Sequence, residues 1–345
     1  MDKRNILNIE RSALVAEPLL AGEKAFRLRQ VYEWLHVKTV SDFSAMTNVG
    51  KALRSRLDSA YYIGGLTEVT KQVSADGTEK YLFELPDGHR IESVLMRYKH
   101  GNSICISTQV GCRMGCRFCA STLDGLARNL TAGEMLAQVY GVQHGIGERI
   151  SNIVLMGQGE PMDNIDEVLK FLRMITDEYG LHISRRNITV STCGLVPAIR
   201  TLADADMGVT LAISLHAPDD VLRRTMMPVA NRYSIDEILA AARYYFEKTG
   251  RRVSFEYALV EGVNDDPGQA RTLAQKLKGL SCHVNLIPVN PVTERDYKRP
   301  RQERIAAFRT VLERQSLNVT VRREMGTDID GACGQLRRRM KPADV

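Results

Sequence analysis

Gly111-Cys-Arg-Met-Gly-Cys-Arg-Phe-Cys119 places three of the chain's seven cysteines on one short loop, at the spacing C-x3-C-x2-C. The thiolates of Cys112, Cys116 and Cys119 can bind three corners of an iron–sulfur cube and leave the fourth iron open to a small molecule. A structural zinc site usually presents two cysteine pairs, or one pair with nearby histidines, and neither pattern follows here. The spacing therefore favours a 4Fe-4S cluster over a structural zinc site and over three unrelated core cysteines.

An alternation of apolar strands and amphipathic helices surrounds this loop. The expected strands, rich in Val, Ile and Leu, span residues 103–109, 152–156, 187–191, 209–215, 252–260 and 283–289. The expected helices include residues 132–145, 165–179, 235–248 and 269–277. Thr131 and Glu134 form a capping box at the first of these helices. The pattern predicts an α/β fold with a parallel sheet, either an open doubly wound sheet or an incomplete (β/α) barrel of six units.

Polar and glycine-rich loops follow these strands one after another. The cysteine loop follows the first strand, Gly157-Gln-Gly-Glu-Pro161 follows the second, and Ser191 ends the third. Ser214-Leu-His-Ala217 ends the fourth strand, and Asn290 follows the sixth. Because ligand sites of parallel α/β folds form at the carboxyl ends of the strands, we expect these five loops to line one pocket.

Single residues in these loops have a chemical and a structural interpretation. Glu160 can offer a carboxylate to an ammonium group, or it can simply precede a helix that begins at Pro161. Ser191, Ser214 and Asn290 are neutral groups suited to a carboxylate or a ribose, whereas His216 alone is more typical of a structural histidine. No G-x-S-x-G, Walker or dinucleotide-binding motif occurs in the chain.

Four cysteines lie outside the cysteine loop and matter to the interpretation. Cys333 lies among small residues, where core packing does not explain a cysteine. Cys105 lies inside the first strand, where a buried apolar role is the ordinary interpretation, unless two reactive cysteines act beside a metal cluster. Cys193 and Cys282 are expected to be structural.

The chain divides by periodicity into four parts. Residues 1–62 are expected to form a small helical unit, with helical spacing over 23–36 and, more weakly, over 49–61. Residues 63–98 alternate with period two around Asp-Gly turns and predict a β-meander linking this unit to the core. The core would span 99–328, and residues 329–345 would form a cysteine-bearing loop and a basic tail.

Composition and charge limit the functional class. At 345 residues and 44% apolar, the chain can bury a large core, and no run approaches the ~18 apolar residues of a membrane span. Without a signal peptide and with an odd number of cysteines, the sequence predicts a cytoplasmic protein. The net charge of +6 lies from Arg295 onward, with 13 Lys and Arg against 7 Asp and Glu. This excess favours a polyanionic substrate.

Motifs spread over nearly the whole chain resemble the radical S-adenosylmethionine superfamily. In more detail they resemble the bacterial dual-specificity RNA adenine carbon-2 methyltransferases. The resemblance rests on Cys105-Ile-Ser-Thr-Gln-Val-Gly-Cys112, Phe118-Cys-Ala-Ser-Thr122, Gly159-Glu-Pro161, Ser214-Leu-His-Ala-Pro218, Asn285-Leu-Ile-Pro-Val-Asn-Pro291 and Asp328-Ile-Asp-Gly-Ala-Cys-Gly-Gln-Leu336. The last motif is the most specific, because other radical enzymes lack it.

Carried over position by position, the resemblance implies a complete set of site residues. Cys112, Cys116 and Cys119 would hold the 4Fe-4S cluster, and S-adenosylmethionine would bind its open iron. The cosubstrate would be surrounded by Gly159, Glu160, Ser191, Ser214, Leu215, His216 and Asn290. The family's fold is an incomplete barrel of six units with a small N-terminal helical domain, which favours the barrel over an open sheet.

The resemblance also implies a reaction that uses two molecules of S-adenosylmethionine per turnover. The first methylates Cys333, and reductive cleavage of the second yields a radical that activates this methyl group for addition to carbon 2 of adenine. Attack by Cys105 then releases the base and leaves a Cys105–Cys333 disulfide. Glu92, in Arg90-Ile-Glu-Ser93, matches the family's proton acceptor, and Cys105 is the other candidate base.

Partners follow from the same resemblance. The RNA substrates would be an adenosine in the peptidyl-transferase region of 23S rRNA and the adenosine next to the anticodon of some tRNAs, with the basic tail contacting phosphates. An electron donor such as flavodoxin or ferredoxin would be needed, and nothing in the sequence demands more than a monomer. Two alternatives stay open: a sister family that methylates carbon 8 of the same rRNA adenosine, and a zinc-stapled, basic RNA-binding protein.

Overall fold

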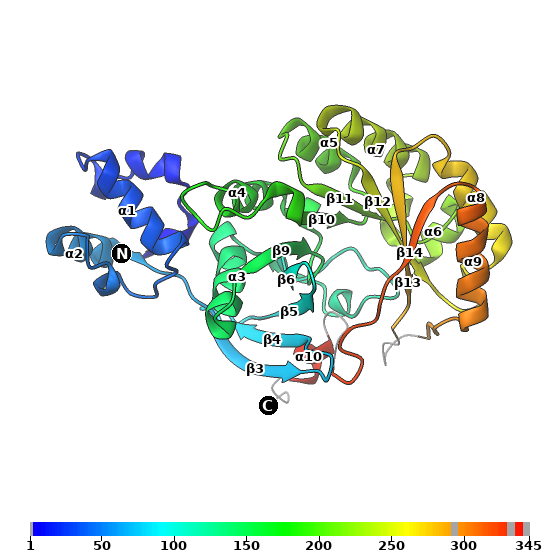
Figure 1. Cartoon of the computed structure of the whole chain (residues 1–345), viewed down its shortest axis with the longest axis horizontal. Coiled ribbons are helices and arrows are strands. Elements are labelled where there is room, and N and C mark those ends of the chain that lie inside the picture. Colours follow the sequence, from blue (N-terminus) through cyan, green and yellow to red (C-terminus); the bar gives the residue numbers. More distant parts are fainter. Residues whose placement is uncertain (1–2, 291–295, 330–334, 341–345) are drawn as a thin grey trace.

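A ten-stranded sheet runs through the main body of the molecule, with the order β14-β13-β12-β11-β10-β9-β6-β5-β4-β3 (Figure 1). The computed structural model describes residues 3–290, 296–329 and 335–340. The sheet strands are β3 (Thr67–Val73), β4 (Glu79–Glu84), β5 (Arg90–Tyr98), β6 (Gly101–Cys105), β9 (Ile150–Leu155), β10 (Ile188–Thr192), β11 (Thr210–Ser214), β12 (Val253–Leu259), β13 (Cys282–Pro288) and β14 (Asn318–Val321).

The part of the sheet from β6 to β14 is parallel, and the part from β3 to β6 is antiparallel. Since β14 and β3 are not neighbours, the sheet stays open, as an incomplete barrel does. The predicted α/β class with a parallel core is confirmed. The predicted meander does more than link two units, because its three strands extend the main sheet.

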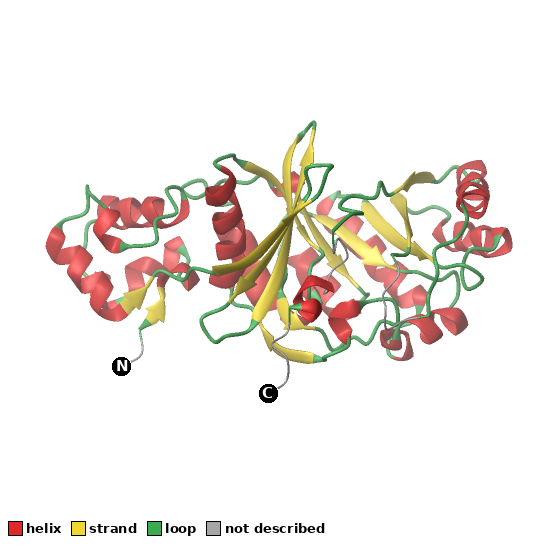
Figure 2. Cartoon of the chain, turned by 90° about the horizontal axis from the view of Figure 1, so that it is seen from below, coloured by secondary structure: helices red, strands yellow, loops and turns green. Residues whose placement is uncertain are grey.

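Helices follow the parallel strands and cover the outside of the sheet (Figure 2). They are α3 (Ala132–Ile146), α4 (Ile165–Ile175), α5 (Val196–Asp204), α6 (Asp220–Met226), α7 (Ile235–Thr249), α8 (Pro267–Leu277) and α9 (Gln302–Arg314). The predicted capping box at α3 is confirmed, since the hydroxyl of Thr131 accepts from the backbone N–H of Glu134 and the Glu134 side chain accepts in return.

Two predicted elements are wrong in their extent. The helix expected over 165–179 ends at Ile175, because the Asp177 side chain accepts from the backbone N–H of Tyr179 and replaces a helical bond. The strand expected over 103–109 ends at Cys105. Gln109–Gly111 instead forms β7, which pairs with β8 (Leu126–Asn129), because Ile106 and Thr108 bond to the chain around the turn after β9.

The N-terminal residues form a helical unit at one end of the molecule (Figure 1, blue). It contains α1 (Ala25–His36), α2 (Lys51–Ala60) and the short parallel pair β1 (Arg4–Asn5) and β2 (Tyr61–Tyr62). The unit packs on α3 and α4, where the Asn8 side chain accepts from the backbone N–H of Gly133 and Arg11 pairs with Asp177. Both helical patterns expected in this region are confirmed.

The last described helix, α10 (Gln335–Arg339), contacts β5 from the far end of the sequence. The backbone N–H of Arg337 donates to the Glu92 carboxylate at 2.6 Å. Cys333, the predicted methyl carrier, lies outside the described residues. Within the described part of the chain, no helix has both the length and the apolar character needed to cross a membrane.

Candidate active site at the carboxyl ends of the parallel strands

A cavity of about 290 Å³ opens where the parallel strands end, a volume near the lower end of the range for small-molecule sites. All five loops predicted to line one pocket contribute to it. The predicted residues on its wall are Cys112, Cys116, Cys119, Gly159, Glu160, Ser191, Ser214, His216 and Asn290. Leu215 does not line the cavity; its buried side chain lies in the core behind it.

Backbone geometry shapes the cysteine loop. Gly111 has φ +77°, and a Cβ there would lie 2.0 Å from the carbonyl oxygen of Gly125, so only glycine can occupy this position. Cys112 N–H donates to that same carbonyl oxygen at 2.8 Å. The loop thus turns Cys112 and Cys116 into the protein, where both are buried, while Cys119 stays partly exposed.

Burial also sets the chemistry of these thiols. It raises the pKa of Cys112 to about 12 and that of Cys116 well above its ordinary value. Neighbouring thiols add to the rise, because each charged sulfur repels the next. Metal ions bound by these sulfurs would offset the free-energy cost of ionising the buried thiols, since a coordinated thiol is deprotonated.

The cysteine loop can be compared with the needs of a cluster. Among the residues that the structure describes, no group of three or more Cys, His, Asp or Glu side chains is arranged to hold one metal ion. In a 4Fe-4S cube each thiolate binds a different iron, so its three sulfurs line one cavity without converging. Cys112, Cys116 and Cys119 line one wall in this way and fit the cluster.

Glu160 presents its carboxylate from the turn after β9. Its two oxygens accept from the backbone N–H of Met162 at 3.0 Å and of Cys193 at 2.7 Å, and burial raises its pKa. The turn is tight, because a Cβ on Gly159 would lie 2.6 Å from Gln109. Pro161 begins a short 3-10 helix that Glu160 caps, so the carboxylate is held in a fixed position beside the cysteine loop.

His216 has a structural role at the end of β11. Its backbone has φ +60°, and its Nδ1 accepts from the backbone N–H of Ala258 at 2.8 Å. Burial lowers the pKa of His216 to about 3, so the ring stays neutral and can accept this bond. The ring is nearly perpendicular to that of Phe118 in the cysteine loop, with 4.7 Å between ring centroids. His216 thus links β11, β12 and the cysteine loop.

Among the wall residues that were not predicted as site residues, three carry a charged or titratable side chain. Glu256 lies in β12, accepts from Ser254 and Asn285, and has its pKa raised by burial. Arg322 follows β14, and Cys193, expected to be structural, lines the cavity beside Cys116. An acidic residue inside the apolar run 252–260 is a sequence signal that could have identified Glu256.

A second cavity of about 150 Å³ adjoins the first. Met156, Ile287, Asn290 and Arg322 line both cavities. Cys105, at the end of β6, lines the second one, together with Val94 and Met96 of β5. Cys105, the predicted second reactive thiol, therefore lies in a cavity that shares lining residues with the cavity of the cysteine loop.

Glu92 lies on the same face of the sheet as Cys105. Cys105 pairs with Val94, and Val94 pairs with Lys80, so these three side chains form a row across the sheet. Glu92, two residues from Val94, belongs to the next row on this face. Its carboxylate is 3.0 Å from the Lys80 ammonium, and both side chains are buried. Glu92 does not line either cavity, and its partners include Lys80 and the N–H of Arg337.

Comparisons with family models identify two parts of the chain. Residues 106–273 match the radical SAM superfamily. Residues 4–63 match the ribosomal RNA large subunit methyltransferase N-terminal domain. The two matches together cover the helical unit and most of the parallel sheet with its cysteine loop.

Close relatives match over nearly the full chain. The chain is 57% identical over 338 residues to a probable dual-specificity RNA methyltransferase RlmN of Lachnoclostridium phytofermentans, covering 98% of this chain and 95% of that protein. It is 56% identical over 337 residues to the Clostridium perfringens protein of the same description, covering 97% of each. A crystal structure of a radical SAM methyltransferase from Sphaerobacter thermophilus superimposes with a TM-score of 0.91 at 43% identity, covering 96% of this chain and 98% of that one.

Fold, cysteine loop and relatives agree on one assignment. The chain belongs to the RlmN family of RNA methyltransferases, enzymes of the radical SAM superfamily.

Proposed function

We propose that this enzyme methylates carbon 2 of an adenosine in the peptidyl-transferase region of 23S rRNA and of the adenosine next to the anticodon in some tRNAs. One observation carries the proposal: the cavity lined by the cysteine loop shares a wall with the cavity that contains Cys105. The thiol proposed to release the product would therefore lie next to the cavity in which the radical forms. The relatives are described as dual-specificity RNA methyltransferases, which agrees with two kinds of RNA substrate.

Cys112, Cys116 and Cys119 would hold the 4Fe-4S cluster, which when bound supplies the electron for cleavage of S-adenosylmethionine. Glu160 would accept from the ammonium group of this cosubstrate, because its buried carboxylate lies on the wall beside the cysteine loop. Ser191, Ser214 and Asn290 would bind its remaining polar groups, with Gly159, Leu215 and His216 shaping the site.

Cys333 would accept a methyl group from a first S-adenosylmethionine and present its carbon to the adenine. After loss of one hydrogen atom this carbon would bond to carbon 2, and the adduct would pass its unpaired electron to an electron carrier and give up the carbon-2 proton. The Cys105 thiolate would then attack the Cys333 sulfur. The carbon–sulfur bond would break, its electron pair would take up a proton to complete the new methyl group, and a disulfide would form. An external reductant must reopen this disulfide before the next turnover. Glu92 would take the proton from carbon 2, with Cys105 as the other candidate base.

Mass spectrometry of nucleosides tests the proposal. The protein is reconstituted with iron and sulfide without oxygen, then incubated with S-adenosylmethionine, a reductant such as reduced flavodoxin, and an rRNA fragment or tRNA. We expect 2-methyladenosine in both RNAs. Formation of 8-methyladenosine would instead support the sister activity. A preparation that binds zinc and no iron, or that carries a full cluster and modifies neither RNA, would contradict the proposal.

A further inference from the structure

Arg223 is a fully buried cation behind the candidate site. It lies in the short helix α6, and its side chain has 0% exposure. Its guanidinium group donates to the carbonyl oxygens of Cys193 at 2.6 Å, Leu215 at 3.0 Å and Ser214 at 3.2 Å. These carbonyls belong to the ends of β10 and β11, two of the strand ends that form the cavity.

The charge of Arg223 is not matched by an ion pair. Among residues 3–290, 296–329 and 335–340, no carboxylate lies within ion-pair distance of its guanidinium group, although Asp220 attracts it from further away. Burial lowers the pKa of Arg223, but an arginine stays protonated in proteins. Carbonyl dipoles satisfy its N–H groups and leave a full positive charge inside the protein.

The helix that carries this charge contacts the cysteine loop. The carbonyl oxygen of Met226, also in α6, accepts from the backbone N–H of Arg117 at 2.9 Å. Met226, Cys116 and Cys193 belong to one buried group of side chains. Burial raises the pKa of the Cys116 thiol, and the charge of Arg223 opposes that rise, as it also does for Cys193.

We propose that Arg223 is the fixed counter-charge of the thiolate-held cluster and raises its reduction potential. This inference rests on the proposed function, because it assumes that Cys112, Cys116 and Cys119 hold a 4Fe-4S cluster. Three thiolates leave such a cluster with net negative charge, and one-electron reduction increases that charge. A cation inside the low-dielectric interior stabilises the reduced form more than the oxidised form. Arg223 is thus a positioning residue, which holds the ends of β10 and β11 through their carbonyl oxygens, and its charge compensates that of the cluster.

Redox titration followed by electron paramagnetic resonance tests this role in the reconstituted full chain. Arg223→Gln keeps one N–H donor for the Cys193 carbonyl and removes the charge, whereas Arg223→Met removes both. We expect a more negative midpoint potential in both variants, and a potential close to wild type in Arg223→Lys, which keeps the charge. Loss of the carbonyl bonds alone would lower thermal stability without moving the potential.

Arg251 provides the matched control. It is a partly buried arginine at the opposite edge of the sheet, where it donates to Thr210 at the beginning of β11. Arg251→Gln is expected to leave the potential unchanged. An unchanged potential in Arg223→Gln, or in Arg223→Met where only that variant folds, would overturn the inference. Failure of the wild-type chain to bind any 4Fe-4S cluster would instead refute the assignment of the cysteines.

Discussion

Cys105 ends strand β6 in the second cavity, and its paired neighbour across the sheet is Val94. Its side chain is buried, and it is the last residue of β6. A thiol at this position can meet a substrate without being open to solvent. The residue therefore suits a thiolate that attacks only once a substrate-bound partner is present.

Cys105→Ala should trap RNA on the protein, because no thiolate remains to attack Cys333 after the new carbon–carbon bond forms. We expect a covalent adduct on a denaturing gel with labelled RNA, and neither product nor adduct with Cys333→Ala. Cys282→Ala, at the amino end of β13, is the control and should behave as wild type. Absence of an adduct in Cys105→Ala would argue against its role in release.

Glu92→Gln should slow methylation by about 10²–10⁴-fold, the usual contribution of a positioned base. The change also leaves the buried Lys80 ammonium without its carboxylate, which should cost about 3–5 kcal/mol of folding free energy. The double variant Lys80→Met, Glu92→Gln removes that second effect. Single-turnover rates in both variants separate the two roles: recovery of the rate in the double variant would show that Glu92 acts only through folding.

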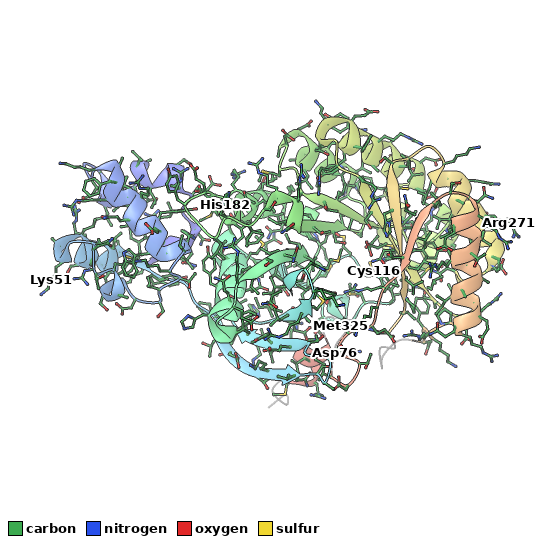
Figure 3. The ribbon with its side chains drawn as sticks, viewed as in Figure 1. Lys51, Asp76, Cys116, His182, Arg271 and Met325 are labelled. Carbon is green, nitrogen blue, oxygen red and sulfur yellow. The ribbon has the colours of Figure 1, made fainter. Side chains whose placement is uncertain are left out.

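At the scale of elements, the turn between β3 and β4 holds the chain segment that leads toward Cys333. Asp76 accepts from the backbone N–H of Gly326 at 2.9 Å, and Asp328 accepts from that of Ala75 at 3.0 Å. Figure 3 shows Asp76 next to Met325 in this contact. The bond from Gly326 is the main reason that the pKa of Asp76 lies below its usual range. These two carboxylates tie the segment after β14 to the edge of the sheet.

Asp76→Ala should lower the methylation rate about tenfold, because loss of charge-assisted hydrogen bonds worth about 1.5 kcal/mol releases this segment. We expect unchanged iron content and unchanged S-adenosylmethionine binding, since the Asp76 side chain lines neither cavity. Asp87→Ala is the matched control in the other Asp-Gly turn, between β4 and β5, where Asp87 pairs with Arg128. Equal effects of the two substitutions on the rate would contradict a specific role of the β3–β4 turn.

At the scale of the whole molecule, the helical unit joins the core through a buried histidine. His36, the last residue of α1, has its Nδ1 2.8 Å from the hydroxyl of Tyr140 in α3. Burial lowers the pKa of His36 to about 3, against 6.5 in an unfolded chain. Between these values the unfolded chain binds one more proton, so acid favours unfolding.

Stability contributed by His36 should be complete above pH 6.5 and fall as the pH drops from there toward 3. Between pH 7 and 5 we expect a loss of about 2 kcal/mol in the free energy of unfolding from this residue. His36→Gln, which stays neutral and can still bond Tyr140, should reduce the pH dependence by that amount. Denaturant titration at pH 5, 6 and 7 measures it. His144→Gln, at an exposed histidine, is the control variant. An equal dependence of the free energy of unfolding on pH in wild type and His36→Gln would contradict the prediction.

Much of the architecture could be predicted from local patterns. Apolar runs and capping signals located the parallel strands and most helices within a few residues, because those signals lie inside each element. The five strand-end loops could be assigned to one pocket, since parallel strands end at the same edge of a sheet. The helix end at Ile175 could not be predicted, because it depends on the hydrogen bond that the Asp177 side chain accepts from the backbone N–H of Tyr179.

The sequence by itself determined the cysteine loop, the α/β class and the family, because spacing and motifs are properties of neighbouring residues. Only the tertiary structure decided that the meander extends the main sheet, that Lys80 pairs with Glu92, and that Arg223 donates to the carbonyl oxygen of Cys193. These facts depend on strand register and on burial, which bring together residues far apart in the chain. Whether Arg223 forms an ion pair, and which cation pairs with Glu92, is therefore fixed only when the chain folds.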